Sequence, residues 1–319
     1  MILWRYFMYI SNNILLLPVC FFGLYFILEA MDWGLCIASS FICKSDDERK
    51  VILKLLRPGI DGNELWFLLG ITALIFFVDS VYNLNESTKI LTGIIILGCI
   101  IRFIFSLGID IFKNKTSCRL MTLFSIISLF FIGCYSFMPL YEESYLLSLV
   151  GVLSSFWMIF SCFQIGCIYG AVKTVNPLSE RFRAGYLVSS LVSVFAYLIF
   201  SFFLKSYFDD NAINSGYYWI GLVSTLIFYV LSFYFVRSRN VKVGLVFAYF
   251  YLICSLSTYF ITYVSKFSCW KILNVILIKK ELVNLHILEI LLITVIWTFV
   301  SFIYKLVRKK LIYKWNDYI

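Results

Sequence analysis

Long apolar runs separated by short polar connections dominate the sequence of this chain of 319 residues. A helix needs about 20 apolar residues to cross the hydrocarbon layer of a membrane. Because lipid offers no hydrogen bonds, each run must satisfy its own backbone polar groups as a helix. The pattern predicts an all-α integral membrane protein, a polytopic bundle of about nine transmembrane helices with eight to ten allowed. The expected spans cover roughly residues 14–31, 65–83, 90–111, 120–140, 145–171, 184–206, 217–236, 243–265 and 286–307.

The lysines and arginines of the connections predict which ends of the spans share a side of the membrane. They are concentrated in alternate connections, and positive connections stay on the cytoplasmic side. We therefore expect the C-terminus in the cytoplasm and the chain in a plasma or inner membrane. The positive segments read KSDDERK, KNKTSCR, NPLSERFR and RSRNVK, followed by the tail KLVRKKLIYKWNDYI.

Two segments do not fit this alternation. The connection that contains residues 268–283 should lie outside although it is rich in lysine. Its amphipathic core could lie along the outer membrane surface as a short helix, and the competing interpretation is a further half-buried segment. The first span must run from outside to inside, although Arg5 and the free amino terminus favour the inside. Residues 31–43 could form a re-entrant or second short span that repairs this.

The composition agrees with a membrane protein and leaves no room for a soluble domain. Hydrophobic residues make up 62% of the chain and charged residues 14%, against about 45–50% and 25% in soluble domains. No connection is long enough to fold separately, so we interpret residues 1–319 as a single transmembrane domain. The net charge of +9 comes from the connections and the tail. Contact with lipid explains this charge, and nucleic-acid binding need not be invoked.

The residues that usually carry metal or cofactor chemistry are sparse. The ten cysteines are scattered without a C-x-x-C pair, and His286 is the only histidine. Metal sites need clustered ligands, so we expect neither a metal nor a cofactor. The sequence signatures of common soluble enzymes are also missing. The sequence favours a non-enzymatic protein without deciding the question.

A basic amphipathic segment follows the first span at residues 48–57. Arg49, Lys50, Lys54 and Arg57 recur there at helical spacing, opposite apolar residues. A helix of this kind at the inner face of a membrane binds anionic lipid head groups. The plainer interpretation is that it only anchors the bundle.

One charge falls in the middle of an apolar run, where the stretch GCIIRFIFSLG contains Arg102. A buried charge of this kind is costly and needs compensation. Asp79 in the preceding span lies about 12 Å away in depth, a gap that two extended side chains leaning toward each other could close. We expect a buried Asp79–Arg102 pair. It would either fix the register of the two helices or bind an anionic substrate.

The fifth predicted span carries small residues at a spacing of four. Gly151 and Ser155 form one such pair, and Gly166 and Gly170 form another. This spacing lets helix backbones approach closely, so we expect the span to be central in the bundle. Gln164 lies in the same run and is a candidate substrate contact.

The connection NPLSERFR contains a cluster of opposite charges. Glu180, Arg181 and Arg183 could form a charge latch between helices on the cytoplasmic side. The alternative is that these arginines are ordinary positive-inside residues.

The succession Gln164, Gly170, Pro177, Gly185 resembles the junction of the fourth and fifth helices in equilibrative nucleoside transporters. The stretch LLLPVCFF near the start resembles their first helix. The resemblance implies a transporter. The D-x-x-G-R signature of the later half is missing, however, so the sequence is assigned to no family.

These features favour a small secondary transporter or permease for an unidentified small solute. The first alternative is a non-catalytic membrane partner, effector or immunity-type protein with a soluble partner at its cytoplasmic connections. The second is a membrane-embedded enzyme acting on lipids or lipid-linked sugars. For that enzyme the outer carboxylates are the candidate residues, namely Glu142, Glu143, Asp209 and Asp210. In every case anionic lipids of the inner leaflet are expected partners.

Overall fold

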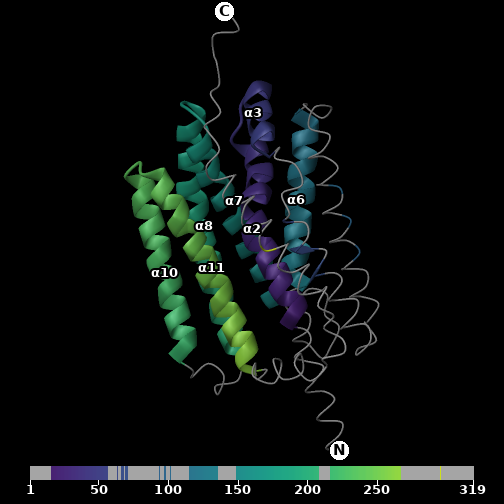
Figure 1. The fold of residues 1–319 in the computed structure, drawn as a ribbon, viewed down its shortest axis with the longest axis vertical. Helices are drawn as coiled ribbons and strands as arrows, with labels where there is room; N and C mark the ends of the chain where they lie inside the picture. The colour runs from purple at the N-terminus through teal and green to yellow at the C-terminus, as the bar shows by residue number, and fades with distance from the viewer. Residues whose placement is uncertain are drawn as a thin grey trace, which may run out of the picture.

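The protein is a bundle of long α-helices, seen here in a computed structural model (Figure 1). The structure describes residues 16–56, 115–135, 149–207 and 216–266, with isolated positions between 63 and 101 and at 295. All secondary structure in this part of the chain is helical, which confirms the predicted all-α membrane fold. The helices are α2 (Leu16–Phe41), α3 (Asp46–Leu56), α6 (Lys115–Tyr135), α7 (Leu149–Lys173), α8 (Leu178–Tyr207), α10 (Gly216–Arg237) and α11 (Val241–Lys266).

Five of the described helices are long and apolar enough to cross a membrane, namely α2, α7, α8, α10 and α11. Helix α6 contains a shorter apolar core, Cys118–Cys134. The expected spans 65–83, 90–111 and 286–307 fall almost entirely outside the described residues, as does the amphipathic segment 268–283. The count of about nine spans therefore stays a prediction.

The first described helix corrects the predicted boundaries at the start of the chain. Residues 14–31 were expected as one span and 31–43 as a separate short segment, whereas α2 runs unbroken from Leu16 to Phe41. Glu29 and Asp32 lower the hydropathy at the expected boundary, but both are buried against protein and do not end the helix. Polar residues are tolerated inside a span when they face the bundle interior.

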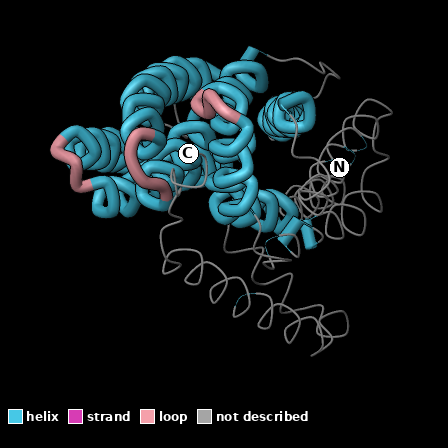
Figure 2. The backbone as a smooth tube through the Cα atoms, turned by 90° about the horizontal axis from the view of Figure 1, so that it is seen from above, coloured by secondary structure: helices cyan, strands magenta, loops and turns pink. Residues whose placement is uncertain are grey.

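Helix α7 lies at the centre of the described bundle, because it packs against α2, α6, α8 and α11. Seen from above, the described helices gather side by side into one bundle (Figure 2). The positive connections lie at one end of the bundle, where α3 also lies (Figure 1). Hydrogen bonds between their side chains and neighbouring helices hold them there. The sequence predicts the same grouping. The side of the membrane that this end faces stays a prediction.

The closest approach between two helices is the crossing of α2 and α7. A methyl group on Gly34 would meet the carbonyl oxygen of Cys162, and one on Gly166 would meet the backbone of Gly34. Only glycine at both positions lets the two backbones come this near. Gly166 lies at this helix crossing, and its counterpart is Gly34 on the first span. The helix-packing role expected of it stays a prediction.

Further small residues of α7 set its contacts with the neighbouring helices. Ser155 faces Gly133 of α6, where an added methyl would come within 2.5 Å of the Ser155 Cα. The Ser154 hydroxyl donates to the Gly133 carbonyl at 2.8 Å and also to the Gly151 carbonyl at 2.8 Å. Gly170 packs under the ring of Phe182 at the start of α8. Such hydrogen bonds between a side chain and a neighbouring backbone tie helices together where lipid supplies no partner.

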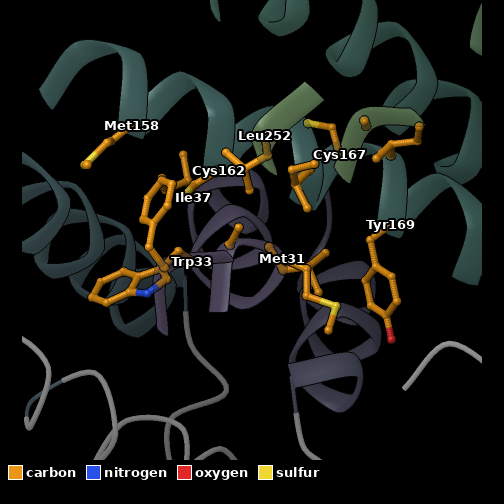
Figure 3. Packing of buried hydrophobic residues seen from close by; sticks show 14 of the residues in the cluster. Met31, Trp33, Ile37, Met158, Cys162, Cys167, Tyr169 and Leu252 are labelled. Atoms are coloured by element: carbon orange, nitrogen blue, oxygen red, sulfur yellow. The ribbon is translucent and has the colours of Figure 1, made fainter. Parts of the chain in front are cut away.

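A large apolar cluster fills the space around the α2–α7 crossing. Trp33 and Ile37 of α2, Cys162 of α7 and Leu252 of α11 belong to it, and each is at most 2% exposed (Figure 3). Helix α7 contributes from several sides of its surface because it is surrounded by other helices. The packing around the crossing holds α2 and α7 in place, and with them the polar side chains of these two helices that lie in the core.

We predict that Gly34→Ala destabilises the fold strongly, because its methyl group would press on backbone atoms that cannot move aside. The expected loss is about 3 kcal/mol in the free energy of unfolding, at the upper end for overpacking. SDS-induced unfolding in mixed micelles measures it. The matched control is Gly23→Ala in the same helix, where nothing lies within 4 Å of the added carbon. Equal unfolding midpoints for the two variants would contradict the crossing.

Candidate functional site

Gln164, the candidate substrate contact, lies on α7 and is completely buried. Neither its amide nitrogen nor its amide oxygen has a hydrogen-bond partner among the described residues. The side chain therefore lies in the packed interior between the described helices, and its role as a substrate contact is not tested by this position. A buried amide without partners is nonetheless costly, and it requires an explanation.

Two carboxylic acids on α2 form a buried acidic site that the sequence interpretation missed. Glu29 is 2% exposed and Asp32 is 5% exposed. The amide nitrogen of Asn63 donates to Glu29 Oε2 at 2.8 Å, and Asn63 is itself 3% exposed. Because the two acids are three residues apart, they lie on one side of the helix, one turn from each other. Asp32 lies less than one turn from Gly34 at the α2–α7 crossing, and Glu29 lies between one and two turns from it.

A signal for these acids was present in the stretch ILEAMDWG. Ionisable residues inside a span are rare and usually functional. The expected boundary at residue 31 placed Glu29 near the end of one span and Asp32 in a separate segment, where acids are unremarkable. Treating residues 16–41 as one helix puts both acids in its second half.

A second group of charges lies at the end of the bundle that carries the positive connections. Arg181 of α8 forms an ion pair with Glu48 of α3, and its guanidinium also donates to the carbonyl oxygen of Ile42 at 3.0 Å. The pair is partly buried, with 23% of the arginine side chain and 14% of the glutamate side chain exposed. It joins α8 to the turn after α2, a contact 133 residues apart in the sequence.

The other members of the predicted latch form local contacts. Glu180 pairs with Arg183 at 2.7 Å within the first turns of α8. Arg183 also reaches the carbonyl oxygen of Arg237 at the end of α10, at 3.5 Å. The structure therefore places Arg181 and Arg183 in contacts that link α8 to its surroundings, while Glu180 pairs within α8. Glu48 is the partner of Arg181 that the sequence did not identify. The role of Glu180, Arg181 and Arg183 as a latch stays a prediction.

Helix α3 is amphipathic, but one of its basic residues faces inward. Arg49 is 6% exposed and pairs with Asp46 at 2.6 Å, and it also donates to the Cys43 carbonyl. Lys54 is exposed, as a contact with lipid head groups requires. The helix begins with a capping box, since the Ser45 hydroxyl accepts from the Glu48 amide and the Glu48 carboxylate accepts from the Ser45 amide.

Glu48 is thus held by several donors, and its pKa reflects them. Partial burial by itself raises the pKa of this carboxyl group. Hydrogen bonds from Arg181 and from the backbone amides of Lys44 and Ser45, with the positive charge of Arg181, outweigh the burial and lower the pKa below its usual value. The folded state therefore favours the charged carboxylate.

The remaining predicted residues do not form a site in the described part of the chain. Asp79 and Arg102 both lie outside the described residues, so their expected pairing is a prediction. The outer carboxylates at 142, 143, 209 and 210 lie outside as well. Within the described residues there is no group of three or more His, Cys, Asp or Glu side chains that could hold a metal ion.

We predict that Glu48→Gln lowers the free energy of unfolding by about 1–2 kcal/mol at pH 7, because a partly buried charged hydrogen bond is lost. A carboxyl group whose pKa is lowered on folding adds stability above its unfolded pKa. That stability disappears as the pH falls through the folded pKa. The difference between wild type and variant should therefore begin to shrink near pH 4, close to the pKa of a free glutamate, and should keep falling as the pH drops further through the lowered folded pKa. Unfolding curves measured between pH 3 and pH 7 give this difference.

Asp47→Asn is the matched control on the same helix. Asp47 pairs with Lys50 at 2.8 Å, and both side chains are more than a third exposed. An exposed pair of this kind contributes less than about 1 kcal/mol. A loss as large in Asp47→Asn as in Glu48→Gln would mean that the contact between α3 and α8 is not what stabilises this end.

Comparison with known proteins supplies the family. The family profile described as cytochrome bd terminal oxidase subunit II matches residues 12–307. Cytochrome bd ubiquinol oxidase subunit 2 of Bacillus subtilis (strain 168) is 24% identical over 245 residues, which cover 71% of this chain and 72% of that protein. The solved structure of bd oxidase from Geobacillus thermodenitrificans has a similar fold, with a TM-score of 0.63 at 15% identity. That similarity covers 80% of this chain and 83% of the solved chain.

This match shows that the predicted function was wrong. The chain is neither a small secondary transporter or permease nor an enzyme of lipids or lipid-linked sugars, and the match leaves no support for an effector or immunity role. The solute and the soluble partner expected with those functions lose their support as well. The error came from features that transporters share with other membrane bundles, such as small-residue packing and buried polar side chains. The location in the inner or plasma membrane as a multi-pass protein is confirmed, and the chain belongs to the cytochrome bd terminal oxidase subunit II family.

Proposed function

We propose that this chain is the second subunit of a quinol-oxidising terminal oxidase and that it works in the membrane bound to a subunit I. The observation that carries the proposal is the family match, because it extends over residues 12–307 and so includes nearly the whole chain. The relative from Bacillus subtilis is a ubiquinol oxidase subunit, which supports a quinol as the electron donor of the complex.

The surface of the described bundle suits a subunit that is surrounded by lipid and protein. Helices α8 and α10 present exposed apolar side chains along their length, including Phe195 at 61%, Phe202 at 68% and Val230 at 60%. Within a membrane such faces contact either lipid tails or another transmembrane subunit. Lys54 on α3 is exposed at the end that carries the positive connections, and we assign it to anionic lipid head groups.

A cytochrome oxidase contains haem. Haem iron is held by histidine, methionine, cysteine or tyrosine side chains. The whole chain contains one histidine, His286, which lies outside the described residues. Met31, Met121 and Met158 are packed inside apolar clusters of the described helices. These methionines of the described helices do not fit a haem site, since each is packed among apolar side chains.

Glu29 and Asp32 are the described residues best suited to take part in the chemistry of the oxidase. Reduction of oxygen to water consumes protons, and a buried carboxyl group can accept and release a proton where water is excluded. Asn63 fixes the orientation of the Glu29 carboxyl group by donating to one of its oxygens. We therefore propose that Glu29 holds a proton in transit, with Asp32 one turn away as its neighbour.

The subunit assignment predicts a stable complex. When this chain is produced together with an affinity-tagged subunit I of a bd-type oxidase from its host, both should be recovered in one detergent-resistant complex. The complex should consume oxygen with a reduced quinol, and omission of this chain should abolish that activity. A tagged multi-pass protein of unrelated family is the control. Recovery of subunit I alone, with full quinol oxidase activity, would refute the assignment.

The proton-handling proposal predicts that Glu29→Gln lowers the rate of oxygen consumption by about a hundredfold, the low end for a positioned proton-transfer group. The amide keeps an oxygen that can accept from Asn63, so the complex should still assemble. Ser39→Ala is the control, because Ser39 is also buried on α2 but carries no ionisable group, and its hydroxyl donates to the carbonyl of Cys36 in its own helix. Normal turnover of Glu29→Gln in an assembled complex would exclude this role.

A further inference from the structure

Hydroxyl groups follow the face of α8 that packs into the bundle. Tyr186, Ser193, Tyr197 and Ser201 recur at helical spacing, and each is at most 2% exposed. At 1.5 Å per residue they extend over about 22 Å, much of the roughly 30 Å hydrocarbon thickness of a membrane. Ser and Tyr hydroxyls in such surroundings must find hydrogen-bond partners on other helices or water.

Some of these hydroxyls are joined to neighbouring helices by direct hydrogen bonds. In the middle, Ser193 bonds to Ser161 of α7 at 2.9 Å and to Tyr251 of α11 at 3.0 Å. Toward the start of α8, Tyr186 bonds to Ser232 of α10. Toward its end, the Ser201 and Tyr218 hydroxyls are 2.7 Å apart. Four hydrogen bonds thus connect α8 to its neighbours, one to α7, one to α11 and two to α10.

Polar atoms without partners lie between these cross-links. Both amide atoms of Gln164, the hydroxyl of Tyr197 and the indole nitrogen of Trp157 have no hydrogen-bond partner among the described residues. All three side chains are at most 1% exposed. Gln164 lies one turn along α7 from Ser161, and Trp157 lies one turn in the other direction. Each unpaired buried donor or acceptor costs about 1–3 kcal/mol, so four of them together are not sustainable in a stable fold.

Other polar groups lie close to the unpaired atoms of Gln164 and Tyr197 but outside direct hydrogen-bond geometry. The Tyr186 hydroxyl is near the Gln164 amide. The Thr225 and Thr258 hydroxyls are near that of Tyr197, and each already donates to a carbonyl of its own helix, at 2.8 Å and 2.7 Å. A bridging molecule at either place would have two or more polar partners. A buried water molecule needs two to four.

We propose that the core between α7, α8, α10 and α11 binds internal water molecules at two places. The first, the Gln164 site, is formed by Gln164 and Tyr186. The second, the Tyr197 site, is formed by Tyr197, Thr225 and Thr258. Water is the ligand that fits, because it both donates and accepts hydrogen bonds and is small enough for a close-packed interior. The two waters extend the direct cross-links into a longer hydrogen-bonded chain along α8.

This inference goes beyond the proposed function, since it does not depend on which reaction the complex performs. Its helices also differ from those of the acidic site, because Glu29 and Asp32 lie on α2. Water at the Gln164 site also explains why a glutamine is present in the centre of an apolar helix. Without a ligand the amide would only destabilise the fold.

Radiolytic labelling with hydroxyl radicals tests the proposal on the purified complex. X-rays split bound water where it lies, so aromatic rings beside internal water are oxidised even when bulk solvent cannot reach them. Tyr186 and Tyr197 should be modified, as mass spectrometry will show, while Phe182 should stay at background. Phe182 is a fully buried ring of the same helix packed against Gly170. Labelling at background level for both tyrosines would overturn the proposal.

The variant Gln164→Leu separates water from intrinsic ring reactivity. It removes one wall of the Gln164 site, so labelling of Tyr186 should fall to background while that of Tyr197 is unchanged. Unchanged labelling of Tyr186 would show that the amide holds no water. These measurements need no turnover, and they can be made on this chain alone if it does not assemble with a subunit I. A failure of the proposed function is therefore distinguishable from a failure of the water sites.

The sign of a stability change gives a second, independent test. If water satisfies the Tyr197 hydroxyl, Tyr197→Phe removes a hydrogen bond and lowers the melting temperature. If the hydroxyl has no partner, its removal relieves a desolvation cost and raises the melting temperature. Tyr218→Phe is the matched control, because its hydroxyl bonds directly to Ser201 and its loss must lower the melting temperature. A higher melting temperature for Tyr197→Phe would overturn the Tyr197 site.

Discussion

The close approach of α2 and α7 at Gly34 and Gly166 is the contact on which the rest of the described bundle depends. Because no side chain separates the two backbones there, their packing distance is set by the backbone atoms alone. Helix α7 is thereby held against α2 on one side, with α6 and α8 on its other faces. The same crossing places Gln164 and the two acids of α2 within the packed interior, since each lies close in sequence to a glycine of the crossing.

A membrane interior makes every buried polar group depend on a protein partner or on water. The described bundle meets this demand in different ways in different places. At the end with the positive connections, charged groups pair partly in contact with solvent, as Arg181 and Glu48 do. On α2, carboxyl groups are buried with an amide partner. Across α7, α8, α10 and α11, the buried polar groups of the described residues are hydroxyls and amides, apart from Lys173 at the end of α7.

The sequence predicts the fold well because each transmembrane helix is determined by residues that are close together in the sequence. Hydropathy alone locates the ends of α7, α8, α10 and α11 to within six residues, and small-residue spacing draws attention to Gly166, which lies at the α2–α7 crossing. Pairings between distant segments could not be predicted in the same way. Glu48 and Arg181 are 133 residues apart, and nothing in either local stretch identifies the other. Asn63 and Glu29 present the same difficulty, because the partner becomes evident only when the helices are assembled.

The function could not be derived from the sequence for a related physical reason. Dense helix packing and a few buried polar residues are what any stable multi-pass protein needs, so they do not distinguish a transporter from an oxidase subunit. The acids of α2 differ chemically from the other buried polar residues. A carboxyl group can exchange a proton at physiological pH, whereas a serine or tyrosine hydroxyl in apolar surroundings does so far less readily. Proton chemistry in the described part of this chain should therefore concentrate on α2. The hydroxyls of α8 are then best understood as groups that hold water and neighbouring helices in place.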